Sequence, residues 1–309
     1  MELVIGIDEN GLGPRLGPMI ATAVALEVER YDEKRLARSL RRIGFTDSKD
    51  VAGFGSMAAG EARALAIVRA ATGSQPATLD ALVRAVSLKD EAWLRATCPT
   101  RGHEPCWQEP LALPAWSSPG QIAAENRALE RALERSGVRL VAVRSSLLCA
   151  SRLNERLSAG MSKSRVDLCA FEELALALVD ALGREARVIC GRVGMLKFYD
   201  GAFGPLSSLL RTTLEESDTR SHYRVLGVGE IEFTVDADRH HAPVALASLV
   251  GKLLREGFVA RMNAFYASRV PGLRHASGYN DPVTAAFIEE TRDARRVACV
   301  PDRCFERLR

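Results

Sequence analysis

The sequence predicts an α/β fold, with a mixed sheet flanked by helices and a helical C-terminal portion. Two observations favour this class. Strand-like and helix-like segments alternate along the chain, and the first two strands are close enough to form an antiparallel hairpin. With 309 residues, of which 47% are hydrophobic, the chain has ample material for a core.

The N-terminal elements begin with two apolar runs, LVIGI and MIATAVALEV, which predict the strands of the hairpin around a glycine-rich loop. Apolar residues then recur at helical spacing in residues 31–43, 56–71 and 120–135. Residues 73–120 lose this periodicity and accumulate Gly, Pro and Trp. We therefore expect them to be an insertion or an excursion over the surface.

The C-terminal half continues the alternation. VRLVAVRSSLLC predicts a strand, residues 166–182 a helix, and ARVIC and EIEFTVDA (230–237) two further strands. The longest helical pattern runs over residues 243–270, and a last helix is expected over 281–295. We therefore expect a core formed by residues 1–242 and a helical portion, residues 243–309, packed on it.

Composition excludes some classes of protein. The 42 Lys and Arg nearly balance the 39 Asp and Glu, so nucleic-acid binding would need a local basic surface. Met1 leads directly into a strand-like run, and no apolar run reaches the roughly 18 to 20 residues of a membrane span. Seven scattered cysteines are typical of reduced thiols. We expect a cytoplasmic monomer that does not bind membranes.

Two adjacent carboxylates, Asp8 and Glu9, are the strongest chemical signal. They stand where an apolar strand ends and the glycine-rich loop begins, a position that repulsion and desolvation oppose unless a cation or a proton compensates. Neighbours on a regular strand point to opposite faces, but a turn at the strand end can bring both to one site. Carboxylate oxygens suit Mg²⁺ or Mn²⁺. The alternative is a pair of solvated acids that end a strand.

Four motifs occur in a characteristic order: GIDENGLGPRLGP, TDSKD (46–50), APVALASLVGKLLRE (242–256) and GYNDPVTAAFIEE (278–290). Together they resemble ribonuclease H of type 2. GLGPRLGP and HHAPVALAS are most similar to a divergent bacterial branch, and residues 73–120 lie outside the resemblance. It implies a ribonuclease H-like fold and a metal-dependent endonuclease. The implied substrate is RNA in RNA–DNA hybrids, or a ribonucleotide in duplex DNA.

The resemblance also implies roles for individual acids. Asp8 and Glu9 match the first two acids of a four-carboxylate site for Mg²⁺ or Mn²⁺. The fourth acid falls on Asp238, with Asp236 as an alternative on the same face if the strand continues. Asp8, Glu9 and Asp238 are the candidate catalytic and metal-binding groups.

The third acid of the family pattern is missing. The family places an Asp after the central strand, where this chain has Gly191 in CGRVG. Asp200, in the nearby KFYDG, could substitute if the strand were threaded differently, and is otherwise a turn residue. We expect the loss at Gly191 to weaken activity. The alternative is a catalytically impaired protein on the same fold that binds hybrids or other nucleic acids.

Substrate-binding roles come from the same motifs. The glycine loop would sense the ribose 2′-hydroxyl through its backbone, with leucine where the family usually has arginine and a further arginine close by. TDSKD would supply a phosphate-gripping pair, and the late Gly-Tyr segment an aromatic ring near the ribose. The candidate substrate-binding residues are Gly11, Leu12, Gly13, Arg15, Ser48, Lys49 and Tyr279.

Overall fold

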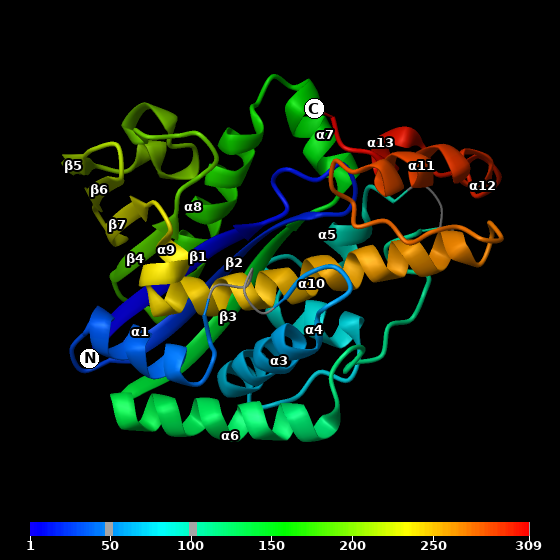
Figure 1. Ribbon diagram of the computed structural model, residues 1–309. Coiled ribbons are helices and arrows are strands. Elements are labelled where there is room, and N and C mark those ends of the chain that lie inside the picture. Colours follow the sequence, from blue (N-terminus) through cyan, green and yellow to red (C-terminus); the bar gives the residue numbers. More distant parts are fainter. Residues whose placement is uncertain (47–51, 99–103, 309) are drawn as a thin grey trace.

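The computed structural model describes residues 1–46, 52–98 and 104–308. Seven strands of this described part form one sheet in the order β3-β2-β1-β4-β7-β6-β5 (Figure 1). The central strand β1 (Glu2–Asn10) pairs antiparallel with β2 (Met19–Val28) and parallel with β4 (Ala186–Gly191), and β4 pairs parallel with β7 (Gly229–Thr234). Because β1, β4 and β7 are parallel, their carboxyl ends meet at one edge of the sheet.

The remaining strands extend the sheet on both sides. β3 (Val138–Leu148) pairs antiparallel with β2, while β5 (Arg211–Glu216) and β6 (Arg220–Val225) form a hairpin beyond β7. The predicted hairpin of the first two strands and the strands at 138–149 and 186–190 are observed. β5 and β6 were not predicted, because RTTLEE and RSHYRV carry few apolar residues to mark a strand.

The helices that cover one face of the sheet include α1 (Glu33–Arg42), α3 (Ala58–Thr72), α4 (Leu79–Val86), α6 (Pro119–Ser136) and α10 (Ala242–Ala267) (Figure 1). The long helix α10 lies directly on β1. A side chain at Gly6 would place its Cβ 2.2 Å from the backbone of Pro243, so only glycine permits this close approach. This contact brings the first turns of α10 to the end of β1.

The opposite face packs on α8 (Lys163–Leu182), while α7 (Ala150–Ser158) lies near the sheet edge with Met19 and Leu148. Leu3, Ile5 and Ile7 face α8, whereas Val4 faces the α10 side. Successive β1 side chains therefore alternate between two buried layers, as they must on a regular strand. The predicted mixed sheet flanked by helices is confirmed.

Residues 73–120 contribute to the core, contrary to the expected surface excursion. They include α4 and the short helix α5 (Glu91–Arg95), and Leu79, Leu82 and Leu94 are buried in the layer around α10. The lack of a continuous periodicity reflects the shortness of these two helices. Whether this segment is an insertion, and whether a boundary falls near residue 242, stay predictions.

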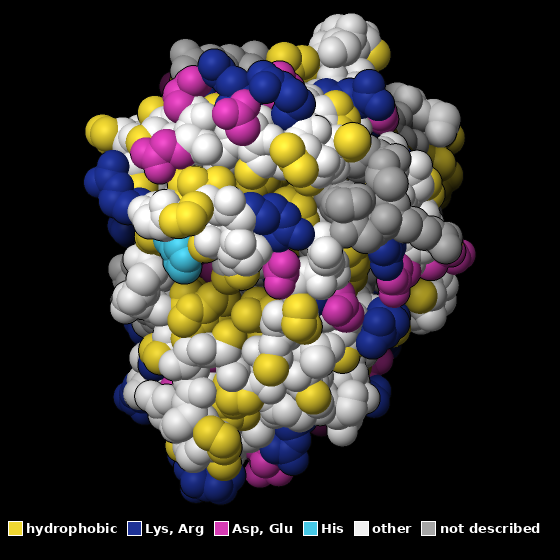
Figure 2. Space-filling view, turned by 90° about the vertical axis from the view of Figure 1, so that its right-hand side faces the viewer, with side chains coloured by type: hydrophobic (Ala, Val, Ile, Leu, Met, Phe, Trp, Pro, Cys, Tyr) yellow, Lys and Arg dark blue, Asp and Glu magenta, His cyan; other side chains and the backbone are white. Residues whose placement is uncertain are grey.

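The C-terminal portion forms its own small core against the end of α10. It comprises α11 (Pro282–Glu290), α12 (Arg292–Val297) and α13 (Asp302–Phe305). The Tyr266 ring centroid lies 5.8 Å from that of Phe287 and 5.4 Å from that of Phe305. Figure 2 shows that the surface at this end mixes apolar side chains with charges of both signs. Among the described residues, no helix combines the length and apolar character needed to cross a membrane.

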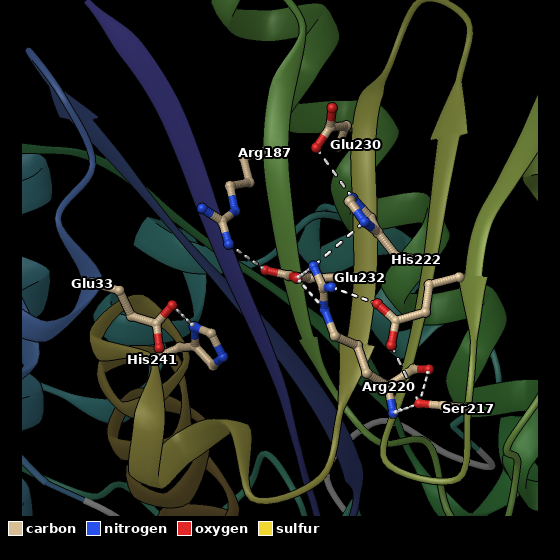
Figure 3. Close-up of polar contacts among 9 residues, drawn as sticks. Glu33, Arg187, Ser217, Arg220, His222, Glu230, Glu232 and His241 are labelled. Carbon is tan, nitrogen blue, oxygen red and sulfur yellow. Dashed lines mark hydrogen bonds and ion pairs between the residues drawn. The ribbon is translucent and has the colours of Figure 1, made fainter.

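Strands β4, β6 and β7 bury apolar residues toward α8 and carry ion pairs on their other face (Figure 3). Glu232 lies between Arg187 and Arg220, with carboxylate-to-guanidinium distances of 3.0 and 2.6 Å. These pairs compensate the charge of Glu232, which is only 2% exposed.

Candidate active site

An open cavity of about 410 Å³ lies at the edge where β1, β4 and β7 end. Its walls come from these strand ends, from the glycine loop, from α9 (Ala237–His240) and from α10. The lining includes Asp8, Glu9, Asn10, Gly11, Leu12, Gly13, Gly191, Arg192, Asp236, Asp238, Ser248, Lys252 and Tyr279. The fold thus brings most of the sequence-predicted residues to one place.

Asp8 points to the α10 side of the sheet, where Ser248 hydrogen-bonds to it. The pKa of Asp8 is raised to about 7, chiefly by burial; the charges of Asp238 and Glu9 contribute to the rise, and the hydrogen bond from Ser248 opposes it. Because the ionised form of Asp8 is disfavoured in this way, the carboxyl group either takes up a proton or is stabilised by a nearby cation.

Glu9 also lines the cavity, but its side chain comes from the opposite face of β1. β1 continues through Asn10 and pairs Glu9 with Ala21, so both acids lie within the regular strand and not at the turn that the sequence suggested. The alternation of β1 directs Glu9 to the α8 side, and its carboxylate accepts a hydrogen bond from the backbone N–H of Leu12. Asp8 and Glu9 share one cavity because both lie at the open edge of the sheet.

The glycine loop is fixed by the C-terminal part of the chain. The backbone N–H groups of Arg15 and Leu16 donate to the carbonyl oxygen of Gly278 at 2.8 and 3.1 Å. Gly11 has a φ of +98°, and an added Cβ there would lie 2.9 Å from the carbonyl oxygen of Pro18. Gly13 differs, because an added Cβ would meet nothing within 4 Å.

Tyr279 and Lys252 form part of the wall near this loop, and Arg255 is buried behind the Tyr279 ring. The fully buried Arg255 lies 4.5 Å from the Tyr279 ring centroid and donates to the carbonyl oxygen of Ser277 at 2.9 Å. Lys252 pairs with Glu256 at 3.3 Å and lies 5.9 Å from the same ring. Arg192 also lines the cavity. Positive side chains therefore stand beside the acidic cluster.

The end of β4 carries no acid. An added Cβ at Gly191 would lie 2.8 Å from Asp8 Oδ1, so a carboxylate at this position would adjoin Asp8 directly. Asp238 lies in α9, and its charge acts on Asp8. The premise for Asp236 is wrong, because the strand ends at Thr234 and Asp236 takes a left-handed conformation with a φ of 51°. Asp236 nevertheless lines the same cavity.

Several candidates lie elsewhere. Asp200 is not in the cavity lining; its Oδ1 accepts from Arg211 Nε at 2.6 Å, so the proposed substitute for the third acid is wrong. Arg15 is likewise outside the lining and pairs with Glu306 at 2.6 Å. Both side chains are held by partners that local sequence does not reveal. Ser48 and Lys49 lie outside the described residues.

His241, which precedes α10, also points away from the cavity. Its Nδ1 lies 3.4 Å from the Glu33 carboxylate (Figure 3), and burial lowers its pKa.

Sequence reasoning missed one acid, Asp167 of α8. It is fully buried, and neither carboxylate oxygen has a hydrogen-bond partner among the described residues. Burial raises the pKa of Asp167 well above its usual value, and the charges of Glu9 and then Asp8 add to the effect. The sequence did contain a signal for this acid: Asp167 lies on the same helical face as Phe171 and Leu174, and that face is otherwise apolar.

The acidic side chains described at the cavity could bind a divalent cation, but they do not form a complete set of ligands around one. Among the described residues, no three acidic, histidine or cysteine side chains converge closely enough to form a metal cage. Mg²⁺ is usually held by one or two carboxylates together with waters and substrate phosphates. The uncompensated oxygens of Asp167 and the raised pKa of Asp8 fit such a cation.

The fold and the site define an α/β protein with a carboxylate cluster at the carboxyl ends of parallel strands, beside a glycine loop. Residues 5–53, which contain both Asp8 and Glu9, match the family model of ribonuclease HII. The ribonuclease HII of Methanocaldococcus jannaschii is 47% identical over 49 residues, which are 16% of this chain and 19% of that protein. The match thus spans about a fifth of the relative's length. The predicted relationship to type 2 ribonuclease H is confirmed over this segment.

Two solved structures align with nearly the whole chain, at TM-scores below 0.5. The PCNA:RNase HII complex of Archaeoglobus fulgidus gives a TM-score of 0.43 at 18% identity, covering 99% of this chain and 94% of that one. The ribonuclease H2 of Pyrococcus horikoshii gives 0.46 at 16% identity, covering 98% and 92%.

Proposed function

We propose that this protein is a divalent-metal-dependent endoribonuclease of the ribonuclease H type. Its substrate would be RNA in RNA–DNA hybrids, or a ribonucleotide within duplex DNA. The observation that supports this proposal best is the shared cavity, in which Asp8, Glu9 and Asp238 lie beside the glycine loop.

The acids would hold Mg²⁺ or Mn²⁺, with Asp8 and Asp238 on the α10 side and Glu9 on the α8 side. Such ions, when bound, provide an activated water and stabilise the leaving oxygen of a phosphodiester. Ser248 orients Asp8 through its hydrogen bond, and Leu12 restrains Glu9 through its N–H. Lys252 and Arg192 would attract the phosphate backbone.

Selection of RNA would depend on the glycine loop. The 2′-hydroxyl is the group that distinguishes RNA from DNA at a given site. The open space beside Gly13 allows a sugar to approach the backbone, and the Tyr279 ring, held over Arg255, would pack against it. Leu12 supplies no charge, so recognition at this loop would rest on backbone groups.

A second candidate function is hybrid binding without turnover. It is favoured by the absence of an acid at Gly191 and by the lack of a preformed three-ligand cage among the described residues. Affinity for the hybrid would then depend strongly on salt, as for any protein that neutralises backbone phosphates.

The two functions are separated by one set of assays. The purified protein is incubated with Mg²⁺ or Mn²⁺ and three end-labelled duplexes of equal sequence: an RNA–DNA hybrid, DNA with one ribonucleotide, and DNA alone. We expect cleavage of one or both ribose-containing duplexes, none of DNA, and loss of cleavage in Asp8→Asn. Binding without cleavage under both metals, also in Gly191→Asp, would establish the second function instead.

A further inference from the structure

Asp167 differs from the other buried acids in lacking compensation. Glu172, one turn further along α8, accepts hydrogen bonds from the backbone N–H groups of Gly204 and Leu206 at 3.0 and 2.7 Å. The remaining buried glutamates of the described part also have partners: Glu27, Glu61, Glu104, Glu232 and Glu256. Asp167 has none, although it is fully buried.

The position of Asp167 connects it to the candidate active site. It lies on α8, against the face of β1 that carries Ile5, Ile7 and, by alternation, Glu9. Its interactions with Glu9 and Asp8 are repulsive, so nothing within the cluster itself stabilises a third carboxylate. A buried carboxyl in these surroundings takes up a proton unless a cation joins it and stabilises its ionised form.

On the other face of the sheet, where Asp8 lies, the end of β4 carries no acid. Gly191 adjoins Asp8 but has no side chain. We propose that Asp167 supplies the carboxylate that Gly191 lacks, as a ligand, direct or through a coordinated water, of a divalent cation held with Asp8 and Glu9. This inference rests on the metal dependence of the proposed function but does not require turnover.

The test measures cation binding rather than cleavage. Metal-free protein is titrated with Mn²⁺, and the free ion is followed by electron paramagnetic resonance for wild type, Asp167→Asn and Glu172→Gln. We expect Asp167→Asn to raise the dissociation constant about 10- to 100-fold. The control Glu172→Gln removes a buried carboxylate from the same helix and should leave Mn²⁺ binding unchanged.

Thermal stability is a second measurement. A purely structural role of Asp167 would predict that Asp167→Asn melts at a lower temperature than wild type, whereas the proposal predicts that it does not. Without metal, Asp167→Asn should melt no lower than wild type, because it removes an uncompensated buried acid. Glu172→Gln should melt lower, because two backbone N–H groups lose a charged acceptor. An Asp167→Asn variant that binds Mn²⁺ like wild type, or that fails to fold, overturns the proposal.

A double variant tests whether the two positions are equivalent. Gly191→Asp places a new carboxylate beside Asp8 and should restore Mn²⁺ binding to Asp167→Asn. A double variant as weak as the single one would overturn this equivalence. If wild type itself binds no Mn²⁺, the metal dependence of the proposed function is wrong. If wild type and Asp167→Asn bind Mn²⁺ equally, only the role of Asp167 is wrong.

Discussion

The guanidinium of Arg307 donates hydrogen bonds to the carbonyl oxygens of Gly11 and Pro14, and so joins the C-terminal tail to the glycine loop at the cavity. Arg307 is only 3% exposed. Burial lowers its pKa to about 10, as does the charge of Arg255, so it stays protonated at neutral pH. The tail therefore determines the position of the loop that the proposed function assigns to the ribose.

Replacement of this guanidinium should affect both stability and substrate binding. Arg307→Met leaves two buried carbonyl oxygens without a donor, and we expect a loss of about 3 kcal/mol in the free energy of unfolding. The KM for a hybrid should rise because the loop is released. Urea unfolding and steady-state cleavage measure these effects. The exposed Arg303→Met serves as control, and equal behaviour of the two variants would contradict the role of Arg307.

The two glycines of the loop should respond differently to alanine. Gly13→Ala adds a Cβ into open space and should change stability by less than about 0.5 kcal/mol. It should nevertheless raise the KM for the hybrid about tenfold, or about 1.4 kcal/mol, because the methyl group occupies the space proposed for the sugar. Gly201→Ala, also in open space but outside the cavity lining, should change neither quantity.

Gly11→Ala, in contrast, should destabilise the fold by about 1–3 kcal/mol, because its φ of +98° and the nearby Pro18 carbonyl disfavour a side chain. Thermal unfolding of Gly11→Ala and Gly13→Ala compares the two directly. A Gly13→Ala variant with unchanged KM would argue against a ribose at this loop.

Substitutions at Gly191 should separate steric from chemical effects. In Gly191→Ala the added Cβ lies 2.8 Å from Asp8 Oδ1 and must displace that carboxylate, so Mn²⁺ affinity should fall roughly tenfold. Gly191→Asp adds a ligand next to Asp8 and should tighten Mn²⁺ binding and raise kcat. Mn²⁺ titration and single-turnover cleavage measure both. Equal losses in the two variants would mean that only the space at Gly191 matters.

The ion pairs of Glu232 should make part of the stability depend on pH. Burial alone would raise the pKa of Glu232, but Arg220 and Arg187 outweigh it and hold this pKa below the usual 4.5. The stabilisation is therefore complete above pH 4.5 and is lost as the pH falls through the lowered pKa.

At neutral pH, Glu232→Gln should cost about 2 kcal/mol, less than a fully buried pair would, because both arginine side chains are about one-third exposed. The difference from wild type should shrink in acid. Urea unfolding at several pH values measures this, with Glu230→Gln, whose carboxylate is only partly buried, as control. A constant difference across the acid range would contradict the assignment to Glu232.

Local sequence was sufficient for the elements that carry a strong pattern. The apolar runs of β1 and β2 indicated the central hairpin, and the helical spacing indicated α3, α6, α8 and α10. It failed for β5 and β6, whose side chains are mostly polar. β6 is stabilised by pairing with β7 and by ion pairs across strands, and β5 by pairing with β6; no local periodicity records these contacts.

The same division holds for the site. The sequence by itself determined Asp8, Glu9 and the glycine loop, because these residues are contiguous and their chemistry follows from their order. Only the tertiary structure decided which distant groups join them. It brought in Asp167 and Arg307, and it engaged Arg15 and Asp200 in ion pairs away from the cavity. The reason is physical: burial and charge pairing depend on which segments the sheet topology brings together, and neighbours in sequence do not reveal them.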